Sequence, residues 1–135
     1  MGTQTPNSVF HYVVTVGLES APEQVIGEFR EANGLEHPVK LPGVHKLGDV
    51  TLKRGVVDSS NLWNWMTQVR SGGPSRRWDA VVTLRNEAGQ PVQSWKLNHA
   101  KPVRYTGPTL GGTGNDIAIE ELILEHESIS IVPPR

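Results

Sequence analysis

Short runs of β-branched and aromatic residues recur along almost the whole chain, and glycine or proline separates one run from the next. The 135 residues include 14 glycines and 10 prolines, which suit the turns between strands. The runs typical of strands are residues 10–16, 25–30, 49–54, 80–85, 92–97, 103–106, 117–125 and 129–131. This spacing predicts a mainly β fold, either a β-sandwich or a small closed barrel.

One segment departs from the strand pattern. Its apolar residues recur with the spacing of a single helix face: Leu62, Trp65, Met66 and Val69. Asp58 or Ser59 can cap its N-terminus, and the Gly-Gly-Pro sequence at 72–74 ends it. We expect one helix over residues 58–71, lying on the outside of the strands.

The strands carry further local signals. In the third one, Val50 and Leu52 share one face while Thr51 and Lys53 share the other, because side chains alternate along a strand. Gly27, within the second, indicates a bulge or a close approach of another strand. The sequence NEAGQP predicts a hairpin between the strands at 80–85 and 92–97.

Length and charge limit the possible classes of protein. A chain of 135 residues predicts a single domain over residues 1–135, with residues 1–8 as a flexible arm. The net charge of -1 does not favour nucleic acid or an anionic membrane as a partner. Without cysteine, the chain forms no disulfide or thiolate site. Neither a secretion signal nor a spanning apolar run is seen, so we expect synthesis in the cytoplasm and no membrane anchor.

Catalytic and ligand-binding motifs are not found. The histidines do not have the spacing of metal ligands: His11, His37, His45, His99 and His126. Glu120 and Glu121 are neighbours on a strand, so their side chains point to opposite faces and do not share a proton. The sequence GGTGND at 111–116 has neither the lysine nor the following helix of a phosphate loop. We therefore predict no enzyme activity, no cofactor and no metal.

Other features favour contacts between proteins. Trp63 falls off the apolar stripe of the helix and is the best candidate for an exposed contact. The strand at 117–125 is apolar on both faces, which is unfavourable at the edge of a monomer and favours a covering neighbour. Cations and carboxylates concentrated in different parts of the chain suit head-to-tail contacts between subunits.

Four segments, taken together and in order, resemble one known family. They are KLPGVHKLGDVTLKRGV, DSSNLWNW, VTLRNEAGQPVQSWKLNHAKPVRYTGP and GNDIAIEELILEHESI, within residues 38–131. They resemble the tail-tube proteins of contractile-tail phages and of contractile injection systems. The L-P-G turn, the T-L-K-R-G strand end, the D-x-x-x-L-W-x-W helix start, the N-E-A-G hairpin and the G-N-x-I-A-I-E strand carry the resemblance.

The resemblance implies a small β-barrel with one flanking helix, similar to the tube protein of type VI secretion. Six copies would form a ring, and rings would stack into a hollow tube inside a contractile sheath, which drives the tube through the target envelope. The implied partners are further copies of the chain, the sheath protein, baseplate or tube-initiator proteins, a tape-measure protein, and effectors or DNA in the lumen. The protein would then be part of a phage tail or injection particle, extracellular after release.

The same resemblance implies roles for particular residues. Candidates for contacts between subunits or stacked rings are Leu41, Pro42, Gly43, Lys53, Arg54, Trp63, Asn115 and Glu120. Thr51 and Lys53 are candidates for the lumen, with Val50 and Leu52 packed inside. The chain departs from the family between Val16 and Val25, where members usually have another strand and turn, so the closure of the barrel stays open.

Two alternatives also stay open. One is a tube-initiator paralogue close to the baseplate, which would form a single ring. The other is a monomeric β-domain that binds a sugar or peptide through its tryptophans. The sequence does not distinguish a phage tail from an injection system or a bacteriocin.

Overall fold

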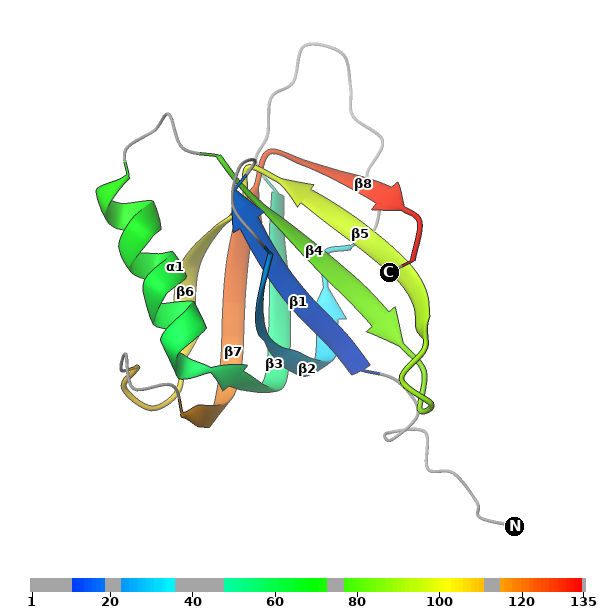
Figure 1. The fold of residues 1–135 in the computed structure, drawn as a ribbon, viewed down its shortest axis with the longest axis horizontal. Coiled ribbons are helices and arrows are strands. Elements are labelled where there is room, and N and C mark those ends of the chain that lie inside the picture. Colours follow the sequence, from blue (N-terminus) through cyan, green and yellow to red (C-terminus); the bar gives the residue numbers. More distant parts are fainter. Residues whose placement is uncertain (1–10, 19–22, 36–47, 73–76, 111–114, 135) are drawn as a thin grey trace.

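The computed structural model describes residues 11–18, 23–35, 48–72, 77–110 and 115–134 (Figure 1). This part of the chain contains eight strands and one helix. In chain order they are β1 (His11–Leu18), β2 (Gln24–Asn33), β3 (Gly48–Asp58), α1 (Ser59–Ser71), β4 (Trp78–Arg85), β5 (Pro91–Asn98), β6 (Lys101–Thr106), β7 (Asp116–His126) and β8 (Ser128–Val132). The proposed arm at residues 1–8 lies outside the described residues.

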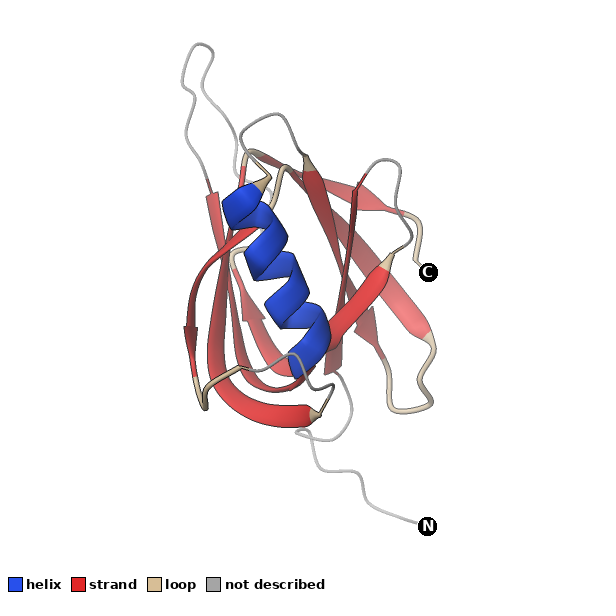
Figure 2. Ribbon diagram, turned by 60° about the vertical axis from the view of Figure 1, so that its left-hand side comes forward, coloured by secondary structure: helices blue, strands red, loops and turns tan. Residues whose placement is uncertain are grey.

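All eight strands belong to one antiparallel sheet with the order β6-β7-β3-β2-β1-β4-β5-β8. Among the described residues, β6 and β8 each pair on one side only, so the sheet does not close and the expected barrel is not confirmed. The sheet instead curls, and α1 lies across its open side (Figure 2). A helix that fills this opening buries the core without pairing of the two edges.

The helix has the predicted period. Asp58 is its N-cap, and the Asp58 carboxylate accepts a hydrogen bond of 2.9 Å from the backbone N–H of Asn61. Leu62 and Trp65 are completely buried. The ring centroid of Trp65 lies 6.5 Å from that of Trp78, at the start of β4, so the helix and the sheet share one core.

The predicted hairpin is confirmed between β4 and β5. The Asn86 side chain accepts hydrogen bonds of 3.0 Å from the backbone N–H groups of Ala88 and Gln90. Gly89 has a φ of 80°, a value that glycine adopts without strain. The turn therefore satisfies its own polar groups.

In three neighbouring strands the alternation of buried and exposed residues is interrupted, and the interruptions lie side by side across the sheet. In β3, Val50 and Leu52 are fully buried, as the alternation predicts, but the next buried residues are Gly55 and Val57. Two successive residues outside the core therefore interrupt the alternation in β3 and likewise in its neighbours. We call these six residues the bend line: Arg30 and Glu31 in β2, Lys53 and Arg54 in β3, and Glu120 and Glu121 in β7.

The bend line also explains the apolar residues on both faces of β7. Ile119 is buried before it, and Leu122 and Leu124 are buried after it. β7 pairs with β3 on one side and β6 on the other, so it is an interior strand. The expectation that β7 needs a neighbouring subunit to cover it was therefore wrong.

Candidate assembly surfaces

The two edge strands differ in how they are protected. β6 contains Lys101, Pro102 and Arg104, and a bulge lies between Pro102 and Arg104. Proline, bulges and cations hinder pairing of an edge with another sheet. β8 has the sequence SISIV, which carries no charge, and Ile131 is 59% exposed. In the described part of the chain, β8 is therefore the edge more open to another protein.

Arg54 combines an exposed side chain with a backbone conformation that suits glycine. Its φ is 56°, in the left-handed region, which costs an ordinary residue about 1–2 kcal/mol. The preceding residue, Lys53, pairs with Glu31 of β2 and with Glu121 of β7. This row of three residues across the sheet therefore reads carboxylate, cation, carboxylate. The left-handed residue lets β3 place Lys53 and Arg54 outside the core in succession.

The structure brings only some of the predicted contact residues together. Arg54 of β3 and Glu120 of β7 are both exposed. They lie between the paired residues Lys53–Glu121 and Gly55–Ile119. Lys53, next to Arg54, is partly buried. Thr51 is partly buried on the side of β3 opposite to Val50 and Leu52, so it does not face the core.

The remaining predicted contact residues lie apart from the bend line. Trp63 is 45% exposed on the outside of α1. Asn115 is exposed, and its backbone oxygen accepts a hydrogen bond of 3.0 Å from the N–H of Ser59, which joins the starts of α1 and β7. Leu41, Pro42 and Gly43 lie outside the described residues.

A hollow of about 290 Å³ lies beside the bend line. Its lining residues come from β1, β2 and β3: His11, Glu28, Phe29, Arg30 and Val56. The Nε2 of His11 is 3.9 Å from a Glu28 carboxylate oxygen. Val56 is 51% exposed. The hollow therefore combines both charges with an apolar wall, a composition that suits a side chain of another protein.

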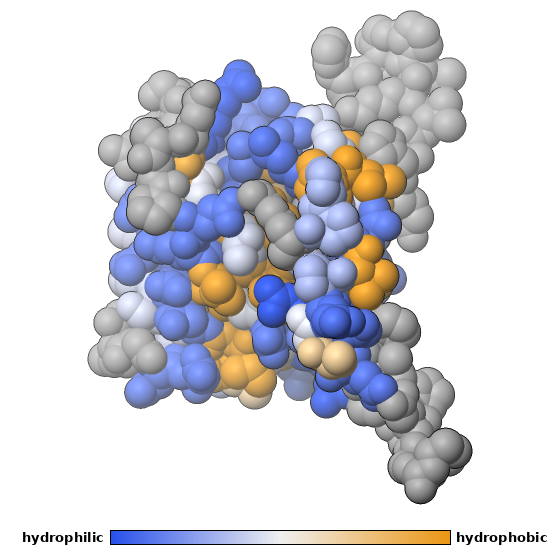
Figure 3. All heavy atoms as spheres, turned by 45° about the vertical axis from the view of Figure 1, so that its right-hand side comes forward, coloured by the Kyte–Doolittle hydropathy of each residue, from blue (hydrophilic) through white to orange (hydrophobic). Residues whose placement is uncertain are grey.

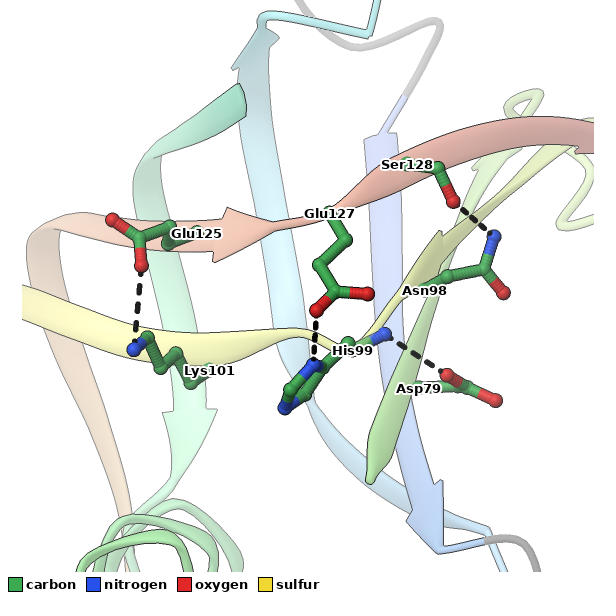
Figure 4. Close-up of polar contacts among 7 residues, drawn as sticks. All are labelled: Asp79, Asn98, His99, Lys101, Glu125, Glu127 and Ser128. Atoms are coloured by element: carbon green, nitrogen blue, oxygen red, sulfur yellow. Dashed lines mark hydrogen bonds and ion pairs between the residues drawn. The ribbon is translucent and has the colours of Figure 1, made fainter. Parts of the chain in front are cut away.

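A polar network joins the turn between β5 and β6 to the turn between β7 and β8 (Figure 4). The Nδ1 of His99 lies 2.8 Å from a Glu127 carboxylate oxygen, and the His99 backbone N–H donates to Asp79 over 3.1 Å. Lys101 and Glu125 lie 3.4 Å apart, and the Asn98 side chain donates to the Ser128 hydroxyl over 2.9 Å. The contacts of Asn98 and His99 lie where β5 ends and β8 begins, whereas the Lys101–Glu125 pair joins β6 and β7 at the other end of the strand order.

Stability in acid is expected to depend on Glu127. The hydrogen bond from His99 lowers the pKa of the Glu127 carboxyl from its ordinary value of 4.5; desolvation opposes this, and the charges of His99 and Arg77 add to it. When the pKa of a carboxyl is lower in the folded state than in the unfolded state, its ionised form stabilises the fold. This stabilisation is complete at pH values above the unfolded-state pKa and is lost as the pH falls through the folded-state pKa.

The Glu127→Gln variant is therefore expected to be less stable than the wild type at about pH 6 and equally stable well below about pH 4. Urea unfolding at a series of pH values measures this difference. A difference that stays constant across the series would show that ionisation of Glu127 contributes nothing.

The described ranges hold no group of three His, Asp or Glu side chains arranged to bind a metal ion. None of the helices in these ranges has both the length and the apolar character needed to cross a bilayer.

Ile131 is a surface residue that was not expected from the sequence. The signal for it was the uncharged run SISIVPP from 128 to 134, which is unusual for an edge strand.

Solved structures from contractile injection systems share this fold. A chain of the PVC sheath–tube complex in the extended state, from an extracellular contractile injection system, has a TM-score of 0.53 and 23% identity, covering 90% of this chain and 87% of that chain. A chain of the PVC sheath/tube terminator in the extended state has a TM-score of 0.54 and 23% identity, covering 98% and 100%. A chain of the anti-feeding prophage baseplate has a TM-score of 0.54 and 23% identity, covering 98% and 97%. At these identities the likeness is one of fold.

No curated protein matches the sequence significantly. The sequence model of a family described as "T4-like virus tail tube protein gp19" matches residues 15–130. The match begins within β1 and ends within β8, so it takes in the bend line and the helix. It confirms the resemblance noted in the sequence and extends it across the short segment after Val16. The chain therefore belongs to the T4-like virus tail tube protein family.

Proposed function

We propose that six copies of the chain form a ring, and that rings stack into a hollow tube inside a contractile sheath. Contraction of the sheath then drives the tube through a target envelope. Membership of the tail tube family over residues 15–130 carries this proposal. The open sheet supports it, because two unlike edges on one subunit suit a head-to-tail contact that closes into a ring.

Thr51 and Lys53 are proposed to line the lumen. They lie on β3 outside the core, and Lys53 has a carboxylate residue opposite it on each neighbouring strand. A lining with both charges in alternation holds no net field that would retain a charged cargo. The proposed contacts between subunits and between rings use Leu41, Pro42, Gly43, Lys53, Arg54, Trp63, Asn115 and Glu120.

The proposed partners follow from the assemblies of the similar structures. Those chains come from a sheath–tube complex, a terminator, a baseplate and a cap. We therefore propose the sheath protein and baseplate proteins as partners, with a tape-measure protein and effectors or DNA in the lumen. Synthesis in the cytoplasm precedes incorporation into the particle, and the subunit acts mechanically, without catalysis.

A second candidate function is that of a tube initiator next to the baseplate. The similarity to a baseplate chain, with a TM-score of 0.54, favours keeping this candidate. An initiator would form one ring and stop, whereas a tube subunit adds further rings on the same axis.

Electron microscopy of the negatively stained, purified protein across a concentration series tests both functions. Hexagonal rings that stack into tubes with an open centre are expected. Single rings at every concentration would favour the initiator. Uniform particles of monomer size at the highest concentration would contradict ring formation by this chain alone.

Arg54→Gly is expected to separate the backbone role of this residue from its contact role. Glycine relieves the left-handed strain, so the monomer should be as stable as the wild type or up to about 1 kcal/mol more stable. If the guanidinium contacts another subunit, the fraction of protein in rings should fall, as measured by sedimentation. Arg54→Asn, which also tolerates this conformation, is the matched variant. Rings that persist in both variants would remove Arg54 from the contact.

A further inference from the structure

The outer face of α1 is almost free of charge. Ser60, Trp63, Asn64, Thr67 and Ser71 form a stripe along it, and Arg70, the one charged residue of the helix, is exposed two turns after Trp63 on the same side. A helix facing solvent normally carries many charges on its outer side. The Ser71 hydroxyl already donates to the backbone oxygen of Thr67 over 2.9 Å. This hydroxyl therefore already has a partner within the helix.

Two tryptophans of α1 point to different environments. Trp65 is completely buried in the core of its own subunit, whereas Trp63 is 45% exposed. Tryptophan and a lack of charge are typical of the centre of protein interfaces. One side of the helix therefore packs on the sheet of its own subunit, and the other side presents a tryptophan that a second protein surface can cover.

The β5–β8 end of the sheet is a surface that its own helix leaves uncovered. α1 packs mainly against β2, β3 and β6. Ile131 of β8 pairs with Trp95 of β5 and is 59% exposed, and the Trp95 ring lies 6.5 Å from that of Tyr12. Figure 3 brings this side of the molecule forward and shows apolar residues reaching the surface among hydrophilic ones.

We propose that the outer face of α1 in one copy packs on Ile131 and Trp95 of the next copy, and that Trp63 is the centre of this contact. The inference rests on the proposed ring and names the two surfaces that join its subunits. The face of α1 around Trp63 carries one charged residue, Arg70, and β8 carries none, in a chain that is 20% charged residues. They lie on opposite sides of the subunit (Figure 1), as a head-to-tail contact requires.

Disulfide formation between two variants tests the contact, because the natural chain has no cysteine. Thr67→Cys, at an exposed residue one turn after Trp63, and Ile131→Cys are prepared separately, mixed in equal amounts under assembly conditions and oxidised, so that the central tryptophan is kept. A disulfide needs Cα atoms within about 7 Å, so only direct neighbours are joined. A reducible dimer is expected from the mixture and from neither variant alone. Val25→Cys, at a residue that is 51% exposed on β2, replaces Ile131→Cys in the control mixture and should give none.

The outcomes separate this inference from the proposed function. Rings that form without a link between positions 67 and 131 would overturn the inference and leave the tube function standing. A link from Ile131→Cys alone would also overturn it, because it would indicate a symmetric contact between two β8 strands. If the wild-type protein forms no rings under any condition, the proposed function fails and the inference fails with it.

A charged variant gives a second measurement. Trp63→Arg should leave the melting temperature of the monomer unchanged, because the side chain lies outside the core. It should lower the fraction of protein in rings by about tenfold or more, as loss of a central tryptophan does in other interfaces. Val25→Arg is the control and should assemble normally. Equal assembly of both variants would contradict the contact.

Discussion

Replacement of Gly27 by alanine is expected to separate β2 from β3 and to destabilise the subunit by about 3 kcal/mol or more, because the added methyl group has no free space. A Cβ atom at this position would lie 2.5 Å from the backbone oxygen of Val56 and 2.8 Å from the Cα atom of Val57. Both are main-chain atoms of the neighbouring strand, so a side-chain rotation cannot relieve the clash. Urea unfolding followed by tryptophan fluorescence measures the loss.

Gly89→Ala is the matched control. Nothing lies within 4 Å of a Cβ atom added there, although the φ of 80° adds some strain. This variant should lose only about 1 kcal/mol. Equal losses in the two variants would show that the close approach of β2 and β3 is not what requires glycine at position 27.

Trp65→Ala is expected to lower the free energy of unfolding by about 3–5 kcal/mol, since it leaves a large cavity in the core. Trp65 is completely buried, and its ring packs against that of Trp78 with centroids 6.5 Å apart. The helix would lose its main attachment to the sheet, so both far-ultraviolet circular dichroism and the unfolding midpoint should change.

Two comparisons make this result specific. Trp65→Phe keeps most of the volume and should lose much less stability. Trp63→Ala removes the same side chain from the outside of the same helix and should cost the monomer less than about 1 kcal/mol. Similar losses from Trp63→Ala and Trp65→Ala would contradict the assignment of one tryptophan to the core and the other to the surface.

Local features of this fold could be predicted from the sequence because short-range chemistry determines them. The helical spacing of Leu62 and Trp65 and the turn residues at Asn86 and Gly89 each specify a local conformation. The alternation also placed Val50 and Leu52 together on one face of β3, and both are buried. Gly27 indicated the close approach that the sheet shows.

The order of the strands could not be predicted, because it depends on pairs far apart in the sequence. The strand at 117–125 was expected to need a covering neighbour, but as β7 it lies between β3 and β6. A strictly alternating strand also gives no sign of the bend line, where Arg54 adopts a left-handed conformation that its residue type does not indicate. The exposure of Trp63 could be read from the helical period, whereas the exposure of Arg54 and Glu120 depends on the bend line.

The pairing of β3 with β7 has a consequence for the newly made chain. β2 and β3 are close in sequence, but Val57 of β3 pairs with Ile117 of β7, about sixty residues further along. At a translation rate of about 5–20 residues per second, that interval lasts about 3–12 seconds. During it, one side of β3 is unpaired, and neighbouring ribosomes on one messenger RNA present the same open strand to each other. We therefore expect slow codons between residues 59 and 115 to lengthen this interval and to lower the yield of correctly folded subunits.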